Sequence, residues 1–148
     1  MPGSVLAARG EALPRAITAA ELQAYFPIAV EGIPDPLPVG YACPPEVPAA
    51  HVAEPAGMFE SSYPDALALQ SWQCSWYHFL GRSDDDASVA IALEHLELVG
   101  ELPQSYTLEV AAYDEYWDAR VEEWGSPSRA AAAEVRRSCQ GAIVAPAP

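Results

Sequence analysis

Three cysteines are the residues best placed to form a covalent link in this chain. Cys43 lies in a proline-rich stretch, Cys74 in an aromatic helical pattern and Cys139 near the C-terminus. Neither a C-x-x-C pair nor another zinc-ligand spacing occurs, so no structural metal site is expected. We predict a Cys74–Cys139 disulfide that ties an alanine-rich C-terminal helix to the central helix and leaves Cys43 free. Cys43–Cys74 pairing is one alternative, and three reduced thiols in a cytoplasmic protein are another.

A thiol and an imidazole lie one helical turn apart in Cys74-x-x-x-His78, a spacing that can activate a thiolate. No third group that would orient His78 can be identified, and His51, His78 and His95 are too dispersed to imply a triad. We expect His95 to be exposed, because its helix already has a core face. Nucleophile-elbow, phosphate-loop and dinucleotide motifs do not occur. The sequence therefore predicts no catalytic residue and no cofactor, and favours a non-enzymatic protein.

Carboxylates recur along one face of a later helix. Asp114, Asp118 and Glu122 follow one another at intervals of four residues, and like charges so placed repel modestly. A solvated helix face accounts for the pattern. The alternative is a docking surface for an arginine- or lysine-rich partner, or a weak site for a divalent ion. The aspartates at 84–86 lack the spacing of a calcium loop, and helix capping accounts for them.

The chain is strongly acidic. Its 148 residues carry a formal net charge of −14, and its seven basic residues are all arginines. Residues 84–124 hold twelve carboxylates against one arginine, whereas the segment from Ser126 onward is slightly positive. Binding to a nucleic acid backbone needs clustered basic residues, so the charge excludes that class of partner. A basic protein is the partner that it favours.

Composition and length indicate one folded domain. The hydrophobic content of 51% is too high for a disordered chain. No run approaches the roughly 20 apolar residues of a membrane span, and residues 1–15 are not a signal peptide as they stand. Because disulfides persist in oxidising compartments, we expect an extracytoplasmic protein whose export segment or anchor is removed or lies upstream. A cytoplasmic protein is the alternative.

Local patterns predict a mainly all-α fold, a bundle of four to five helices with a proline-rich, extended N-terminal strap. Eight of the fifteen prolines lie in residues 27–55, where neither a helix nor a central strand can run. Tyr106–Val110 is the best candidate for a strand. We expect a short helix and the strap in residues 1–57, the helical domain in 58–142 and a flexible tail in 143–148. The helices are predicted at about 18–26, 62–81, 84–99, 109–124 and 126–140.

Capping signals set the ends of these helices. The predicted starts at Thr18 and Ser62 each have an acidic residue three positions later, as in a capping box. Pro27 is expected to stop the first helix. Gly81 is expected to end its helix in left-handed geometry, and Gly125 is expected to cap a later one.

Aromatic residues at helical spacing form two stripes, which we expect to pack against each other rather than to form a ligand cage. The stripes are Trp72, Trp76 and Phe79 in one helix, and Tyr113, Trp117 and Trp124 in the other.

The segment Trp72-Gln73-Cys74-Ser75-Trp76 resembles a W-x-C-x-W element of small uncharacterised helical domains from high-GC bacteria. In those proteins a similar helix is followed by further helices and a cysteine near the C-terminus, here Cys139. Such domains are membrane-anchored or exported, so the resemblance, which covers Trp72 to Cys139, implies a location outside the cytoplasm and indicates no activity. The leading hypothesis is a non-enzymatic extracytoplasmic domain, structural or protein-binding. A cytoplasmic immunity-type inhibitor that binds a basic partner is the alternative.

Overall fold

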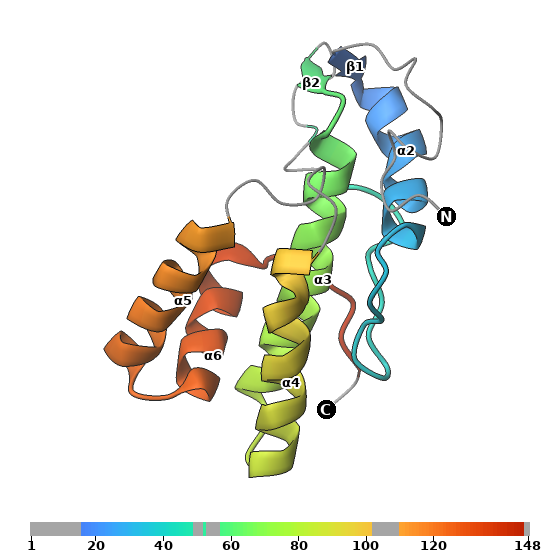
Figure 1. The fold of residues 1–148 in the computed structure, drawn as a ribbon. Coiled ribbons are helices and arrows are strands. Elements are labelled where there is room, and N and C mark those ends of the chain that lie inside the picture. The colour runs from blue at the N-terminus through green and yellow to red at the C-terminus, as the bar shows by residue number, and fades with distance from the viewer. Residues whose placement is uncertain (1–15, 49–51, 53–56, 102–109, 147–148) are drawn as a thin grey trace.

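The fold is mainly helical, as predicted. The computed structural model describes residues 16–48, 52, 57–101 and 110–146, and this part of the chain is a helical bundle with one small sheet (Figure 1). Of the predicted strand, only Val110 is described, and it begins a helix. In chain order the elements are β1 (Ala16–Thr18), α2 (Ala19–Glu31), β2 (Met58–Glu60), α3 (Tyr63–Gly81), α4 (Asp86–Glu97), the 3₁₀ helix η2 (Leu98–Glu101), α5 (Val110–Trp124) and α6 (Pro127–Ser138).

Helix α3 lies at the centre of the bundle. It contacts α2, α4 and α6, whereas α5 packs against α6 on one side of the molecule (Figure 1). Both faces of α3 are buried: Trp72 and Trp76 lie on one face, and Leu67 and Cys74 on the other. A helix covered by neighbours on several sides needs apolar or small residues around most of its circumference.

Three helix starts have side-chain caps, two of which the sequence predicts: the one at Thr18 and the one from the aspartates at 84–86. In each case a side-chain oxygen accepts a hydrogen bond from the third helical amide, which satisfies one of the free donors at a helix N-terminus. The Thr18 box is complete, since the Glu21 carboxylate also accepts from the Thr18 amide at 2.9 Å. The capping residues are Thr18, Asp85 and Ser126.

The prediction that Pro27 stops the first helix is wrong. Helix α2 continues through this proline to Glu31 and ends at Gly32. A proline inside a helix removes one backbone hydrogen bond, at a cost of about 3 kcal/mol. Phe26 and Ala29, on either side of Pro27, are both buried, and this burial offsets the missing bond.

Helix α3 spans the residues that the sequence predicts, but the geometry at its two ends differs from the prediction. Ser62 precedes α3 but makes no side-chain cap, because its backbone is helical (φ −84°, ψ −6°) rather than extended. Gly81 closes α3 without the predicted left-handed geometry, whereas Gly125, which follows α5, has a positive φ of 86°. The glycine at 81 permits close packing instead: a Cβ there would lie 3.1 Å from the Ala132 backbone nitrogen.

Strands β1 and β2 form a short antiparallel pair that the sequence analysis did not predict. Ile17 lies opposite Phe59 in the register, and its side chain is fully buried. Strands of three residues have too little alternation for a sequence pattern to show. Their pairing brings the start of α2 next to the segment that leads into α3.

The proline-rich strap lies against the helices. Between α2 and Pro48 its only strand-like pairing is the bridge from Ala42 to Val144. The Gln23 side chain of α2 hydrogen-bonds both to the Val47 carbonyl, at 3.1 Å, and to the Val47 amide, at 2.8 Å. Residues before and after position 57 share one hydrophobic core. Val144, in the predicted flexible tail, is held by its two backbone bonds to Ala42.

The two aromatic stripes do not pack on each other as predicted. Trp72 and Trp76 face the strap and α4, where the Trp76 ring stacks on His95 with centroids 3.9 Å apart. Trp117 stacks instead on Tyr77, an α3 residue outside the predicted stripe. Helix α6 packs between α5 and α3. A long side chain such as Tyr77 is therefore needed for α3 to contact α5.

Candidate functional site

A pocket of about 220 Å³ lies between α4 and α5. We call it the acidic pocket, because three carboxylates surround its apolar and aromatic walls. Asp114 and Asp118, two of the three acidic residues that the sequence singled out, line it. Glu122 is exposed one turn further along α5 and does not line the pocket. The lining residues are Leu93, Leu96, Glu97, Tyr113, Asp114, Trp117 and Asp118.

The aromatic wall of the acidic pocket is anchored to α3. The hydroxyl oxygens of Tyr113 and Tyr77 lie 2.8 Å apart in a hydrogen bond, and the Trp117 ring stacks on Tyr77 with 5.4 Å between centroids. Tyr77 is only 6% exposed, so the ring that both side chains contact is fixed in the core. Tyr113 and Trp117 are therefore positioned without any ligand.

The charge of the acidic pocket comes from its carboxylates and not from its tyrosine. Burial raises the pKa of Tyr113 to about 12, and the charges of Glu134 and Asp114 act in the same direction. Its phenol is therefore neutral at ordinary pH. Glu97, Asp114 and Asp118 are exposed at the rim, and the lining includes no arginine or lysine that could neutralise them.

This arrangement has the chemistry of a site for one basic side chain. The aliphatic stem of a lysine or arginine can lie against Leu93 and Leu96 while its charged end remains near the rim carboxylates. Trp117 adds a ring for a cation–π contact, which an arginine makes more often than a lysine.

The structure brings together Cys74 and Cys139, the pair that the sequence analysis favoured. Their sulfur atoms are 2.07 Å apart and link α3 to the residue after α6. Cys74 therefore has no free thiol for His78 to activate. His78 instead has its Nδ1 2.7 Å from the Tyr41 hydroxyl, and burial lowers its pKa. Cys43 is the remaining free thiol, and burial raises its pKa.

The prediction that His95 is exposed is wrong. Its Nδ1 donates a hydrogen bond to the Asp35 carboxylate at 2.7 Å, and Trp72 Nε1 donates to the same oxygen at 3.1 Å. Trp76 Nε1 donates to the Pro36 carbonyl at 3.1 Å. The histidine is thus part of a polar cluster that fastens the strap to α3 and α4. His51 lies outside the described residues.

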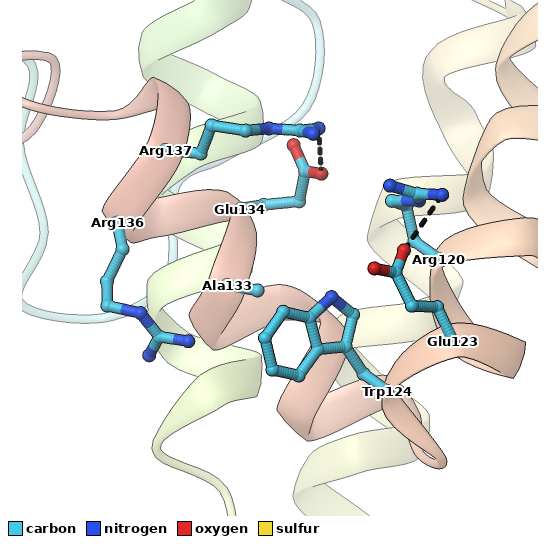
Figure 2. A pocket seen from close by; sticks show the side chains of 7 residues that line it. All are labelled: Arg120, Glu123, Trp124, Ala133, Glu134, Arg136 and Arg137. Carbon is cyan, nitrogen blue, oxygen red and sulfur yellow. Dashed lines mark hydrogen bonds and ion pairs between the residues drawn. The ribbon is translucent and has the colours of Figure 1, made fainter.

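A second pocket, of about 280 Å³, lies between α5 and α6, and Figure 2 shows its side chains. We call it the arginine groove. The positive charge of the C-terminal segment is visible in the sequence, but it predicts no site by itself. The available signal was a single arginine within the acidic α5 and an adjacent arginine pair in α6. The lining residues are Arg120, Glu123 and Trp124 of α5, and Ala133, Glu134, Arg136 and Arg137 of α6.

The structure gives no support to a divalent-ion site at the acidic residues of α5. Within the ranges that the structure describes, no group of three or more histidine, cysteine, aspartate or glutamate side chains could hold a metal ion. None of the helices described there has the length and apolar character needed to cross a bilayer.

Comparisons of the chain with protein-family models, with curated proteins and with solved structures found no match.

Proposed function

We propose that the chain is a non-enzymatic, extracytoplasmic protein-binding domain whose acidic pocket takes a lysine or arginine side chain of a basic partner. One observation carries the proposal: three rim carboxylates surround a hollow whose aromatic wall is fixed by α3. A fixed pocket with few polar groups at its rim is the usual form of a recognition site.

The charge of the whole chain supports a basic partner. The net charge is −14, and the exposed Glu115 and Glu122 extend the negative surface along α5 beyond the pocket. Such a surface attracts a basic protein over several ångströms and raises its association rate, an effect that salt weakens.

Two observations support a location outside the cytoplasm. The Cys74–Cys139 pair, with a sequence separation of 65, would stabilise the fold by roughly 4 kcal/mol in the chain-entropy model, and oxidising compartments preserve such bonds. The resemblance of Trp72–Trp76 to exported helical domains points to the same location.

A binding experiment with a short oligo-arginine peptide tests the acidic pocket. Isothermal titration at low salt should detect binding to the wild type, and an oligo-glutamate peptide should not bind. The double variant Asp114→Asn/Asp118→Asn removes two charged contacts, each worth up to about 1 kcal/mol. The affinity should therefore fall about five- to tenfold.

The matched control is Asp84→Asn/Asp86→Asn, which removes the same charge from exposed positions outside the pocket and leaves the Asp85 cap intact. This control should change the affinity less than twofold. Equal weakening by both double variants would mean that net charge alone attracts the peptide, and the proposed pocket would then be rejected.

The state of the cysteines tests the proposed location. Mass spectrometry of oxidatively refolded, non-reduced protein should show a Cys74–Cys139 linked peptide and one alkylated thiol at Cys43. Reduction of a Cys43→Ser variant, which prevents thiol exchange, should lower the free energy of unfolding by 2–4 kcal/mol, roughly the native-disulfide range. Three free thiols after oxidation would contradict the extracytoplasmic proposal and favour a cytoplasmic inhibitor.

A further inference from the structure

The three cysteines of the chain meet at one turn of α3. Cys74 lies in that turn and is bonded to Cys139. The Ser71 hydroxyl, three residues earlier on α3, donates a hydrogen bond to the sulfur of Cys43. Residues three positions apart on a helix are neighbours, with about 5–6 Å between their Cβ atoms. The free thiol of Cys43 is therefore held next to the disulfide rather than in a separate part of the fold.

The strap passes over the disulfide as it follows α3. The Tyr41 hydroxyl lies 2.7 Å from Nδ1 of His78, and Cys43, two residues later, reaches Ser71. On α3, Cys74 lies between these two contact points and about one turn from each of them. Its side chain is only 3% exposed. The part of the strap between the two contacts therefore covers the turn that carries the disulfide.

The segment that follows α6 lies against the same part of α3. The Gln70 side chain donates a hydrogen bond at 2.8 Å to the carbonyl of Ser138, the residue just before the second cysteine of the disulfide. Further along, Ala42 and Val144 exchange two backbone hydrogen bonds of 3.0 and 2.8 Å. The strap and the C-terminal segment thus lie side by side (Figure 1) and approach the disulfide together.

A thiol beside a disulfide can exchange with it. The Cys43 sulfur, after loss of its proton, attacks the sulfur of Cys74. The Cys43–Cys74 bond forms, the Cys74–Cys139 bond breaks, and the electron pair leaves on the Cys139 sulfur, which takes up a proton. One thiol and one disulfide are present before and after, so the step needs no oxidant or reductant. Burial raises the pKa of the Cys43 thiol, and since only a thiolate attacks, the exchange is slow at neutral pH.

We propose that Cys43 is an exchange partner of the Cys74–Cys139 disulfide, so that the folded chain interconverts between two disulfide isomers. In the isomer that the structure shows, the bond ties the end of α6 to α3. In the other isomer the bond ties the strap to α3, and Cys139 is the free thiol. The exchange thus switches the covalent link of α3 from the C-terminal segment to the strap. The inference requires an oxidised protein but does not depend on the acidic pocket.

The variant Cys139→Ser tests whether the second pairing fits the fold. In a glutathione redox buffer its two remaining cysteines should form the Cys43–Cys74 bond within one chain, and mass spectrometry of the digested, non-reduced protein should detect the linked peptide. Tryptophan fluorescence should show that the oxidised variant is folded. Two free thiols in the folded variant, or a disulfide between two chains, would overturn the proposal.

The wild type tests the exchange itself, in an assay that needs no variant to fold. The oxidised protein is held at mildly alkaline pH without added thiol, quenched with acid at intervals and mapped by mass spectrometry. We expect a minor isomer of about 1–10%, with Cys43 linked to Cys74 and Cys139 free, which forms at a rate independent of protein concentration. Absence of this isomer after a day, or a rate proportional to protein concentration, would contradict the proposal.

Ser71→Ala tests the contact that holds the thiol. The variant loses a donor to the Cys43 sulfur, so the exchange should slow about three- to tenfold, as expected for one hydrogen bond. Ser75→Ala is the matched control, because Ser75 is also buried on α3 and its hydroxyl donates to the Ser71 carbonyl within the helix. Its rate should stay within twofold of the wild type. Equal changes in both variants would mean that exchange passes through the unfolded chain, and the proposal would be rejected.

Discussion

Tyr77 and Tyr113 share a hydrogen bond between their phenol groups, and this pair contributes to the response of the fold to alkali. Burial raises the pKa of Tyr113 to about 12 and that of Tyr77 well above its ordinary value of 10.0. In the unfolded chain both phenols ionise near pH 10. The pair therefore contributes stability that is fully present below pH 10 and is lost as the pH rises through the folded-state pKa.

We expect the free energy of unfolding to fall between pH 10 and pH 12, with about 1–3 kcal/mol of the loss due to Tyr113. Tyr113→Phe should show a shallower fall over this range, because position 113 then has no proton to release. Urea denaturation of both proteins at a series of pH values measures the difference. The same alkaline slope in both would contradict the assignment.

Residue types and spacing predict some residues of the candidate site, but not the side chains within the chain that contact them. Asp114 and Asp118 are recognisable because they recur on one helix face. His95 gave no comparable signal, since its hydrogen-bond partner Asp35 lies sixty positions earlier in the chain. Tyr77 was also missed, because its role depends on α6 holding α5 away from α3. Contacts between residues so far apart in the sequence arise from tertiary packing rather than from a local sequence pattern.

At the scale of elements, helix bounds that depend on local signals were predicted, whereas the end of α2, which depends on a neighbouring helix, was not. Thr18 and Asp85 cap their helices through residues three positions away, so the signal is contained in a short segment. Pro27 would end an isolated helix, and burial against α3 overrides it. Gly81 ends α3 as predicted, and its lack of a side chain also allows close contact with α6.

The close approach of α3 and α6 predicts an unusual sign for Gly81→Ala. Alanine normally stabilises a helix relative to glycine by about 1 kcal/mol. Here its Cβ would lie 3.1 Å and 3.2 Å from backbone atoms of Ala132, and the overpacking should instead destabilise the fold by about 1–3 kcal/mol. Urea denaturation measures the change.

Ala90→Gly, at an exposed position in α4, calibrates the ordinary difference between alanine and glycine in this protein. It should destabilise the fold by about 1 kcal/mol. A Gly81→Ala protein more stable than the wild type would show that α3 and α6 can separate without cost.

At the scale of the whole molecule, α5 separates the acidic pocket from the arginine groove. The acidic pocket lies between α5 and α4, and the arginine groove lies between α5 and α6. The composition predicts the sign of each half of the chain, since acidic residues dominate up to Trp124 and basic ones follow. The composition alone could not place the two pockets on either side of one helix, because their positions depend on how α5 packs against its neighbours.

The strap connects three helices and should therefore be needed for the stability of the whole molecule. Asp35 accepts hydrogen bonds from Trp72 of α3 and His95 of α4, and its side chain is only 12% exposed. Val47 bonds to Gln23 of α2. Asp35 thus links the strap to both α3 and α4.

Asp35→Ala should lower the free energy of unfolding by about 2–4 kcal/mol, because it leaves two partly buried donors without an acceptor. Asp35→Asn keeps an acceptor oxygen and should lose less. Asp84→Ala, which removes an exposed carboxylate, should change stability by less than about 0.5 kcal/mol. Urea denaturation followed by tryptophan fluorescence distinguishes the three variants. If Asp35→Ala were no worse than Asp84→Ala, the strap would lie on the bundle without stabilising it.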